Sequence, residues 1–139
     1  MYKTPYSVAY PFIFHSEENG GYFIESVDVQ GAYTGINSEN VAEGIAMAEE
    51  VLGMVLADMV ENSEALPIPT PIKEVQTECD AFVTLISVDV EEYFKDTELV
   101  KKTLSIPKWA NTMGNRIGIN FSRLLTDAIA EAATNLSNK

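Results

Sequence analysis

The chain has 139 residues, 46% of them apolar, and a formal net charge of −12. This size and composition predict a small globular protein and exclude a disordered one. No apolar run approaches the roughly 18 residues of a membrane span, and we expect no signal peptide. The single cysteine, Cys79, excludes an internal disulfide framework and favours a reducing, cytoplasmic setting. We expect it to be a small residue in or near the core.

The charge is divided unevenly along the chain. Residues 1–98 hold 3 basic and 19 acidic residues (net −16), whereas residues 99–139 hold 6 basic and 2 acidic residues (net +4). Two segments of opposite charge suggest two partners of opposite charge. The acidic segment would repel nucleic acid or attract a basic protein, and the basic segment is suited to phosphate. The alternative for the acidic segment is a solvated surface that binds nothing.

The first forty residues predict an antiparallel meander of three short strands. Each strand is rich in aromatic and β-branched residues, and Asn19-Gly20 is a strong hairpin-turn signal between the first two. Pro11 suggests that the first strand lies at an edge or carries a bulge. The predicted strands cover residues 3–14, 22–27 and 32–36.

Residues 39–61 predict an amphipathic helix. Apolar side chains recur there at spacings of three and four residues, which puts them on one face. Asn37-Ser38 offers an N-cap, because a short side-chain oxygen can accept the free amides of a first turn. We expect the methionines of this helix to lie in the core rather than on an adaptable binding surface. They are Met47, Met54 and Met59.

The prolines of LPIPTPI, residues 66–72, exclude a helix and predict a stiff surface connection. Residues 81–90 then predict a fourth strand, which would lie beside the meander. The order β-β-β-α-β closes a domain over residues 1–92, and the polar residues 93–99 form a hinge. The remaining residues, 100–139, are too few to build a stable core alone.

These last forty residues predict a strand and two helices. In VKKTLSI, residues 100–106, apolar and polar side chains alternate. Pro107 suits the start of a helix, Gly118 ends it as a left-handed cap, and Asn120 or Ser122 caps the second helix. A lone strand leaves backbone groups unpaired. We therefore predict a symmetric dimer in which two strands pair antiparallel and four helices share one core.

The predicted dimer core consists of apolar side chains from the strand and both helices. These are Leu104, Ile106, Trp109, Met113, Phe121, Leu124, Leu125 and Ile129.

VKKTLSIPKWANTMGNRIGINFSRLLTDAI resembles the ribbon-helix-helix fold of bacterial repressors, with its alternating strand, Pro-led helix, Gly turn and N-x-S helix opening. The resemblance implies that the ribbon enters the major groove of DNA, where base edges are distinguishable. It makes Lys101, Thr103 and Ser105 the base-reading residues. Phosphate contacts would come from the start of the second helix and from nearby basic residues. These are Lys102, Lys108, Asn120, Phe121, Ser122 and Arg123. The alternative is a dimerisation module with a solvated lysine face.

The stretch YPFIFHSEENGGYFIESVDVQGAYTGINSENVAEGIAMAEEVLGMVL resembles the N-terminal domain of HicB antitoxins, from HicAB toxin–antitoxin systems. The matching features are YPFIFH, GGYFIE, D-x-x-G at Asp28 and Gly31, the amphipathic helix and the Pro-rich turn. The sequence departs from the family at Gln30, usually a proline, and at Ala32, often a cysteine. With the C-terminal module, the resemblance spans nearly the whole chain.

The joint resemblance implies an α+β protein: an N-terminal, partial ribonuclease H-like β-β-β-α-β domain without an active site, and a C-terminal ribbon-helix-helix module. It implies an antitoxin that binds and inhibits a small, basic, HicA-like mRNA-cleaving toxin and represses its operon by binding double-stranded operator DNA. The assembly would be a homodimer or a tetramer. The candidate toxin-binding residues are His15, Glu17, Glu18, Tyr22, Glu25 and Asp28.

Two other functions compete with this interpretation. Glu25, Asp28 and Asp89 could converge on two metal ions as in a nuclease, but no motif fixes them. One histidine and one cysteine supply a transition-metal site poorly, so we expect no enzyme activity, metal or cofactor. The stronger rival is a ligand-sensing ribbon-helix-helix repressor without a toxin partner. His15 is either a functional contact or a half-buried structural residue.

Overall fold

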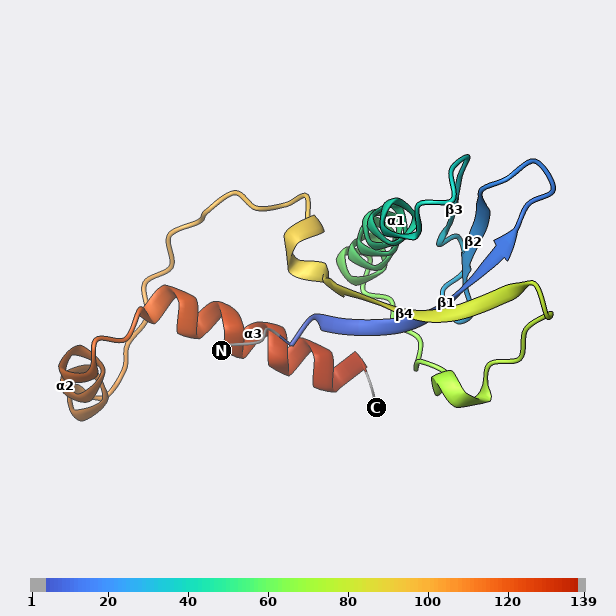
Figure 1. Cartoon of the computed structure of the whole chain (residues 1–139). Coiled ribbons are helices and arrows are strands. Elements are labelled where there is room, and N and C mark those ends of the chain that lie inside the picture. Colours follow the sequence, from blue (N-terminus) through green and yellow to red (C-terminus); the bar gives the residue numbers. More distant parts are fainter. Residues whose placement is uncertain (1–4, 138–139) are drawn as a thin grey trace.

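The computed structural model describes residues 5–137. Figure 1 shows a sheet with one helix packed on it and, at the end of a long connection, two further helices, the first of which lies away from the sheet while the second runs back toward it. No helix in this described part combines the length and hydropathy that crossing a membrane requires. The elements in chain order are β1 (Ser7–Ser16), β2 (Tyr22–Ser26), β3 (Tyr33–Ile36), α1 (Val41–Glu61), the 3₁₀ turn η1 (Ile72–Glu74), β4 (Ala81–Asp89), the 3₁₀ turn η2 (Val90–Tyr93), α2 (Lys108–Ile117) and α3 (Phe121–Ser137).

The four strands form one antiparallel sheet in the order β3-β2-β1-β4. The predicted meander and the return of the fourth strand beside it are both confirmed, and the fold is α+β. β4 pairs with β1 along almost its whole length, from Ser7↔Asp89 to His15↔Ala81. β1 is therefore an interior strand that connects the meander to β4.

The prediction that Pro11 marks an edge or a bulge is wrong. Pro11 lies inside β1, and the register with β4 continues through the Pro11↔Leu85 pair without a bulge. On its other side, the β1–β2 ladder begins only at Phe12. There the Pro11 carbonyl accepts a hydrogen bond from the Val27 amide (3.1 Å). Because Pro11 stands at the end of that ladder, its missing amide donor interrupts no strand pairing.

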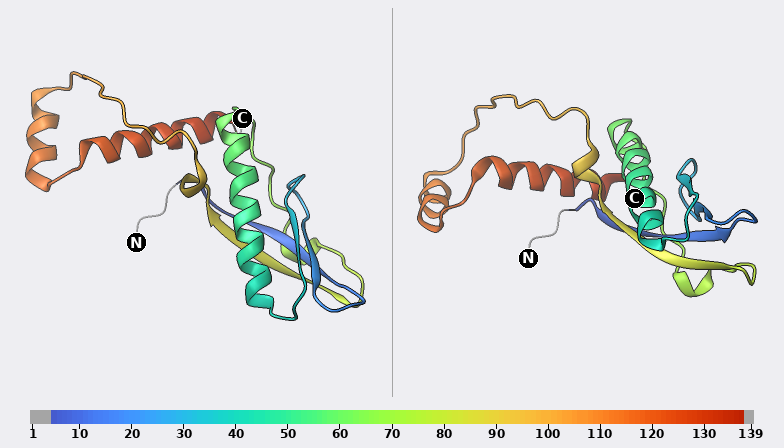
Figure 2. Two further views of the ribbon diagram at one scale, coloured as in Figure 1. Left: turned by 90° about the horizontal axis from the view of Figure 1, so that it is seen from above. Right: turned by 45° about the horizontal axis from the view of Figure 1, so that its top comes forward.

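The core lies between one face of the sheet and α1 (Figure 2). Small residues let the helix approach closely: a Cβ atom on Gly44 would lie 2.8 Å from the Phe14 ring, and one on Gly53 only 2.3 Å from the Tyr93 ring. The largest fully buried side chains come from β1, β2, α1, β4 and η2. They are Tyr10, Phe12, Phe14, Ile24, Leu52, Leu56, Ile86, Val90 and Pro11.

The predicted helix is confirmed to within two residues, but its cap is different. Asn40 caps α1, because its Oδ1 atom accepts a hydrogen bond from the Ala42 amide (3.2 Å). Ser38, which we expected at the cap itself, supports it from outside: its hydroxyl accepts the Asn40 amide (3.2 Å) and donates to Glu43 (2.9 Å). The predicted cap at Asn37-Ser38 is therefore two to three residues too early.

Two predictions about burial are also wrong. Met47 and Met54 are 40% and 57% exposed on α1, and only Met59 packs against the core. Cys79 is exposed rather than in or near the core. The two errors have different reasons. α1 covers a single face of the sheet and has an outer side in solvent, and Cys79 lies in the turn before the edge strand β4.

The proline-rich segment runs over the surface, as predicted, and is fixed at two points. The Tyr10 hydroxyl donates to the Pro67 carbonyl (2.6 Å). Asp28 accepts hydrogen bonds from both the amide (2.9 Å) and the hydroxyl (2.6 Å) of Thr70. These contacts tie the connection to β1 and to the β2–β3 turn.

The C-terminal module is joined to the domain by a long irregular connection. Its first residues are held at the end of α1, where the Glu61 carboxylate accepts hydrogen bonds from the amides of Lys95 (3.2 and 3.3 Å) and Asp96 (3.2 Å). Residues 97–107 then contain neither helix nor strand.

Candidate functional site

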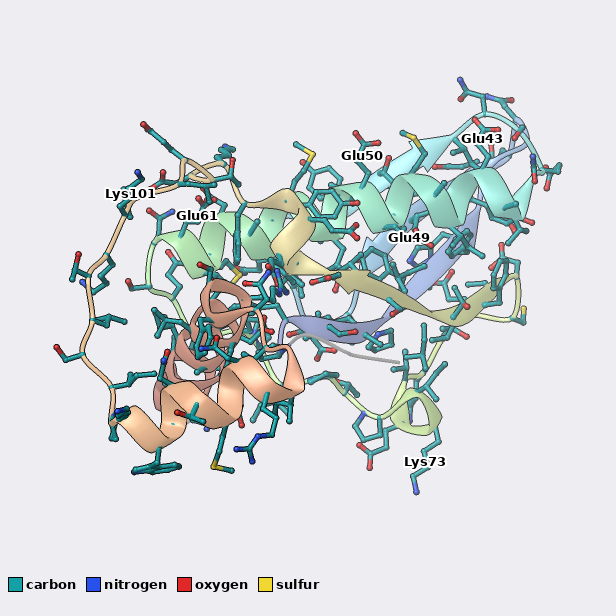
Figure 3. The ribbon with its side chains drawn as sticks, turned by 90° about the vertical axis from the view of Figure 1, so that its left-hand side faces the viewer. Glu43, Glu49, Glu50, Glu61, Lys73 and Lys101 are labelled. Atoms are coloured by element: carbon teal, nitrogen blue, oxygen red, sulfur yellow. The ribbon has the colours of Figure 1, made fainter. Side chains whose placement is uncertain are left out.

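The segment expected to form the DNA-binding ribbon is extended away from the rest of the chain. Residues 100–106 form no strand in the single chain, where no second strand lies beside them. All seven are exposed, including Lys101, Thr103 and Ser105. Figure 3 shows Lys101 on this outer connection. The geometry leaves the expected base-reading side chains accessible and the backbone of the segment available for pairing.

The turn between α2 and α3 forms as the sequence predicts. Gly118 adopts the left-handed conformation (φ 74°, ψ 35°), and the Ile119 amide donates to the Gly114 carbonyl (2.9 Å). Asn120 caps α3, since its Oδ1 atom accepts the Arg123 amide (3.0 Å). Pro107 stands one residue before α2 rather than in its first turn. The two helices are thereby fixed relative to each other by local contacts.

The apolar face of this module is uncovered. All eight residues expected in the dimer core are exposed in the single chain, with Trp109 67% and Ile129 58% accessible. Phe121 makes one close internal contact, its ring lying against Gly114 where a Cβ atom would be only 2.6 Å away. Apolar side chains gathered on two short helices in this way mark an interaction surface.

The expected phosphate-binding residues divide into two groups. Lys102 and Lys108 are exposed, and Asn120, Phe121 and Ser122 lie at the start of α3. Arg123 instead points back to the N-terminal domain: its Nη1 and Nη2 atoms lie 3.0 and 3.3 Å from the two Glu91 oxygens. The hydrogen bond to Glu91 and then its charge raise the pKa of Arg123.

The sheet face opposite α1 carries an aromatic patch with a histidine–glutamate contact. His15 Nε2 lies 2.9 Å from Glu25 Oε2 on neighbouring strands. The His15 ring stacks near Phe23 (centroids 6.0 Å apart), which in turn lies 6.2 Å from Tyr33. Tyr33 is 60% exposed. We call His15, Phe23, Glu25 and Tyr33 the open-face patch.

Only two of the predicted toxin-binding residues belong to this patch. His15 is half-buried and meets Glu25, whereas Glu17 and Glu18 are exposed in the β1–β2 turn. Tyr22 lies on the other face of the sheet, against the Phe14 and Phe82 rings. Asp28 is bound to Thr70 and positions the proline-rich segment.

Sequence reasoning missed Phe23 and Tyr33. The signal was present, because both alternate with core residues along their strands and must face away from α1.

The carboxylates considered for catalysis do not converge. Glu25 pairs with His15, Asp28 bonds Thr70, and Asp89 accepts the Glu91 amide at the far end of β4 (3.1 Å). Across residues 5–137, no three His, Cys, Asp or Glu side chains are grouped so that they could hold a metal ion.

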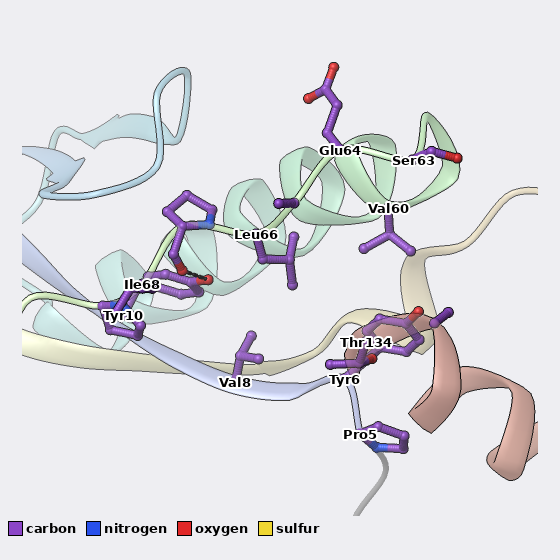
Figure 4. A pocket seen from close by; sticks show the side chains of 14 residues that line it. Pro5, Tyr6, Val8, Tyr10, Val60, Ser63, Glu64, Leu66, Ile68 and Thr134 are labelled. Carbon is purple, nitrogen blue, oxygen red and sulfur yellow. Dashed lines mark hydrogen bonds between the residues drawn. The ribbon is translucent and has the colours of Figure 1, made fainter. Parts of the chain in front are cut away.

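A cavity of about 580 Å³ lies where the two parts of the molecule meet (Figure 4). Its walls come from the start of β1, the end of α1, the proline-rich segment and α3. Tyr6, Val8, Leu66 and Ile68 make it largely apolar, and Thr134 contributes from α3. The Tyr10 hydroxyl at its edge is already bonded to Pro67. The cavity therefore lies between α3 and the N-terminal domain.

Comparison with known proteins gives a consistent result. Residues 10–113 match the family described as the HicB-like antitoxin of bacterial toxin–antitoxin systems. The structure is similar to a chain of a toxin–antitoxin complex from Streptococcus pneumoniae, with 34% identity and a TM-score of 0.57, over 91% of this chain and 99% of that one. A crystal structure of the antitoxin HicB3 shares the fold at 18% identity and a TM-score of 0.51, over 91% of this chain and 96% of that one. No curated protein sequence matches the chain significantly.

Proposed function

This chain belongs to the HicB-like antitoxin family, whose members are not enzymes, and we propose that it inhibits a small, basic, HicA-like mRNA-cleaving toxin and represses its own operon. One observation supports the first part of this proposal, toxin inhibition. A third of the residues are identical to those of a component of a toxin–antitoxin complex, and the match covers nearly the full length of both chains. The partners are then the toxin, operator DNA and a second copy of this chain.

The open-face patch is our candidate for toxin docking. α1 covers one face of the sheet, and the other face keeps aromatic side chains in solvent. Aromatic residues are enriched at the energetic centres of interfaces. The acidic residues 1–98 around them complement a toxin that must be basic to hold RNA, and opposite charges speed association. We keep Glu17 and Glu18 as rim contacts and leave out Asp28, because both of its oxygens hold Thr70.

The second half of the proposal concerns residues 100–139, which we assign to a ribbon-helix-helix dimer. Three properties support it: an unpaired segment of alternating side chains, an uncovered apolar face on two helices, and a net charge of +4. A second copy would pair the segment and cover the apolar face in one step. The paired segments would then present Lys101, Thr103 and Ser105 to the major groove.

Co-expression with the small open reading frame beside its gene tests the antitoxin function. We expect that product to arrest growth alone, and this protein to bind it and restore growth. Tyr33→Ala should weaken the complex at least tenfold, as expected for an exposed aromatic anchor. Met54→Ala is the matched control, because Met54 has a similar exposure but lies on the opposite side of the domain, on α1. A neighbouring product that is neither toxic nor bound would refute the antitoxin function.

A further inference from the structure

α3 uses two opposite sides for two different contacts. Arg123, Asp127, Ala130 and Thr134 follow one another at spacings of four, three and four residues, which places them on one side of the helix. This side meets the N-terminal domain: Arg123 bonds Glu91, Ala130 packs against the core, and Thr134 lines the cavity. By the same geometry, the residues of the expected dimer core lie on the opposite side. Docking onto the domain and pairing with a second copy are therefore compatible.

Arg123 and Glu91 form a bidentate contact. The guanidinium donates from both terminal nitrogens to both carboxylate oxygens, at 3.0 and 3.3 Å. Glu91 is itself held in place, because its amide donates to Asp89 at the end of β4 (3.1 Å). Asp127 adds a third contact to the guanidinium at 3.0 Å from within α3. The salt bridges found for lysine and arginine side chains between residues 5 and 137 all involve Arg123.

We propose that Glu91 restrains operator binding by occupying Arg123, so that the N-terminal domain and a DNA phosphate compete for the same guanidinium. A carboxylate and a phosphate are both bound by the planar donor fork of arginine, and a phosphate bound through both terminal nitrogens needs the same two donors that Glu91 occupies. The inference rests on the proposed DNA binding of the C-terminal module. It also couples the two modules energetically. A movement of η2 away from α3 would remove Glu91 from Arg123 and make the guanidinium more available to a DNA phosphate.

The size of the restraint follows from its exposure. The side chains of Arg123 and Glu91 are 47% and 27% exposed, and ion pairs with this much exposure to solvent are weak. We therefore expect an effect of about two- to fivefold in affinity for each DNA half-site. The restraint therefore adjusts binding and does not switch it off.

A double-mutant cycle on the full-length protein tests the competition. Glu91→Gln should tighten operator binding about two- to fivefold per half-site in titrations at low salt. Arg123→Gln should weaken binding, and Glu91→Gln should bring no gain when added to it. Glu92→Gln is the control, because it removes the same charge one residue away, from an exposed side chain. Equal effects of the Glu91 and Glu92 variants, or an undiminished gain in the Arg123→Gln background, would overturn the proposal.

A second measurement needs no DNA. The chain has one tryptophan, Trp109 on α2, and one cysteine, Cys79 beside β4, and both are exposed. Energy transfer from Trp109 to an acceptor on Cys79 reports how closely the two parts are held. Glu91→Gln should lower the transfer and Glu92→Gln should not; unchanged transfer in Glu91→Gln would show that the ion pair does not hold the modules together. A third outcome is that no variant binds operator while Glu91→Gln still lowers the energy transfer. This result would refute the proposed DNA binding and, with it, the competition.

Discussion

The dimer can be tested by shortening one apolar side chain of α3. Ile129 is 58% exposed in the single chain. Fully burying an isoleucine contributes about 1.5–3 kcal/mol, so covering this remaining surface in a dimer contributes roughly 1–1.5 kcal/mol per copy. Alanine keeps about a third of that apolar area, which makes the loss for Ile129→Ala about 1 kcal/mol per copy. Because a symmetric dimer loses it twice, the dimer should weaken by about 2 kcal/mol, or about 30-fold in Kd.

Sedimentation equilibrium over a range of concentrations measures this Kd directly. Met54→Ala is the control, since Met54 has nearly the same exposure (57%) but lies on α1 and outside the C-terminal module. We expect it to leave the Kd unchanged. If Ile129→Ala dimerises as tightly as the original chain, or if both variants weaken equally, the apolar face of α3 does not form the dimer core.

Three further changes probe the core and residues 100–106, the segment proposed to read DNA. Thr103→Ala should cost about 1–3 kcal/mol on operator DNA and little on a scrambled sequence; equal losses on both would make Thr103 a phosphate contact. Gly53→Ala should lower the free energy of unfolding by about 1–2 kcal/mol in urea, because its Cβ would lie 2.3 Å from the Tyr93 ring, and an unchanged midpoint would contradict the close packing. Tyr10→Phe should cost about 1 kcal/mol by leaving the Pro67 carbonyl without its donor. Burial, and then Asp28, raise the pKa of Tyr10 above its ordinary 10.0. Stability is therefore lost as pH rises above about 10, and in Tyr10→Phe this alkaline loss, followed by circular dichroism, should be smaller.

The order of elements was predictable because it depends on local patterns. Alternating strands, turn residues and a three-to-four spacing identify the meander, α1 and β4 within a few residues of their observed limits. The left-handed Gly118 and the Asn120 cap were likewise predictable, since each interaction closes within five residues. Such signals require no knowledge of the tertiary fold.

The errors came from features that depend on the layers of the fold. The methionines of the amphipathic helix were all expected in the core, yet α1 has only one sheet beneath it, so Met47 and Met54 on its outer side face solvent. Pro11 reads as an edge residue, yet it lies in an interior strand at the one point where the neighbouring ladder has ended. In both cases the local preference of the residue is satisfied. Whether its side chain is buried or its strand lies inside the sheet depends on the number and order of the packed layers and strands.

The long-range side-chain contacts were the least predictable, because they join distant parts of the chain. Asp28 and Thr70 are 42 residues apart, and Glu91 and Arg123 are 32 apart. The sequence offered 21 carboxylates and no means of choosing among them. The His15–Glu25 pair is an intermediate case, because the hairpin register between β1 and β2 places the two residues diagonally across the ladder.

The division of charge between the two segments has a consequence inside the molecule as well as toward its partners. A −16 segment joined to a +4 segment brings carboxylates close to basic side chains, and we propose Glu91, which contacts Arg123, as a competitor of DNA phosphate. A phosphate contact normally contributes about 0.9 to the slope of log affinity against log salt. For Arg123 that contribution should be smaller, because salt weakens the internal ion pair as well as the DNA contact. Replacing Glu91 with glutamine should therefore steepen the salt dependence while tightening binding at low salt, and the two curves should converge as salt rises. A general gain from removing one negative charge would also shrink with salt, but Glu92→Gln would then reproduce it.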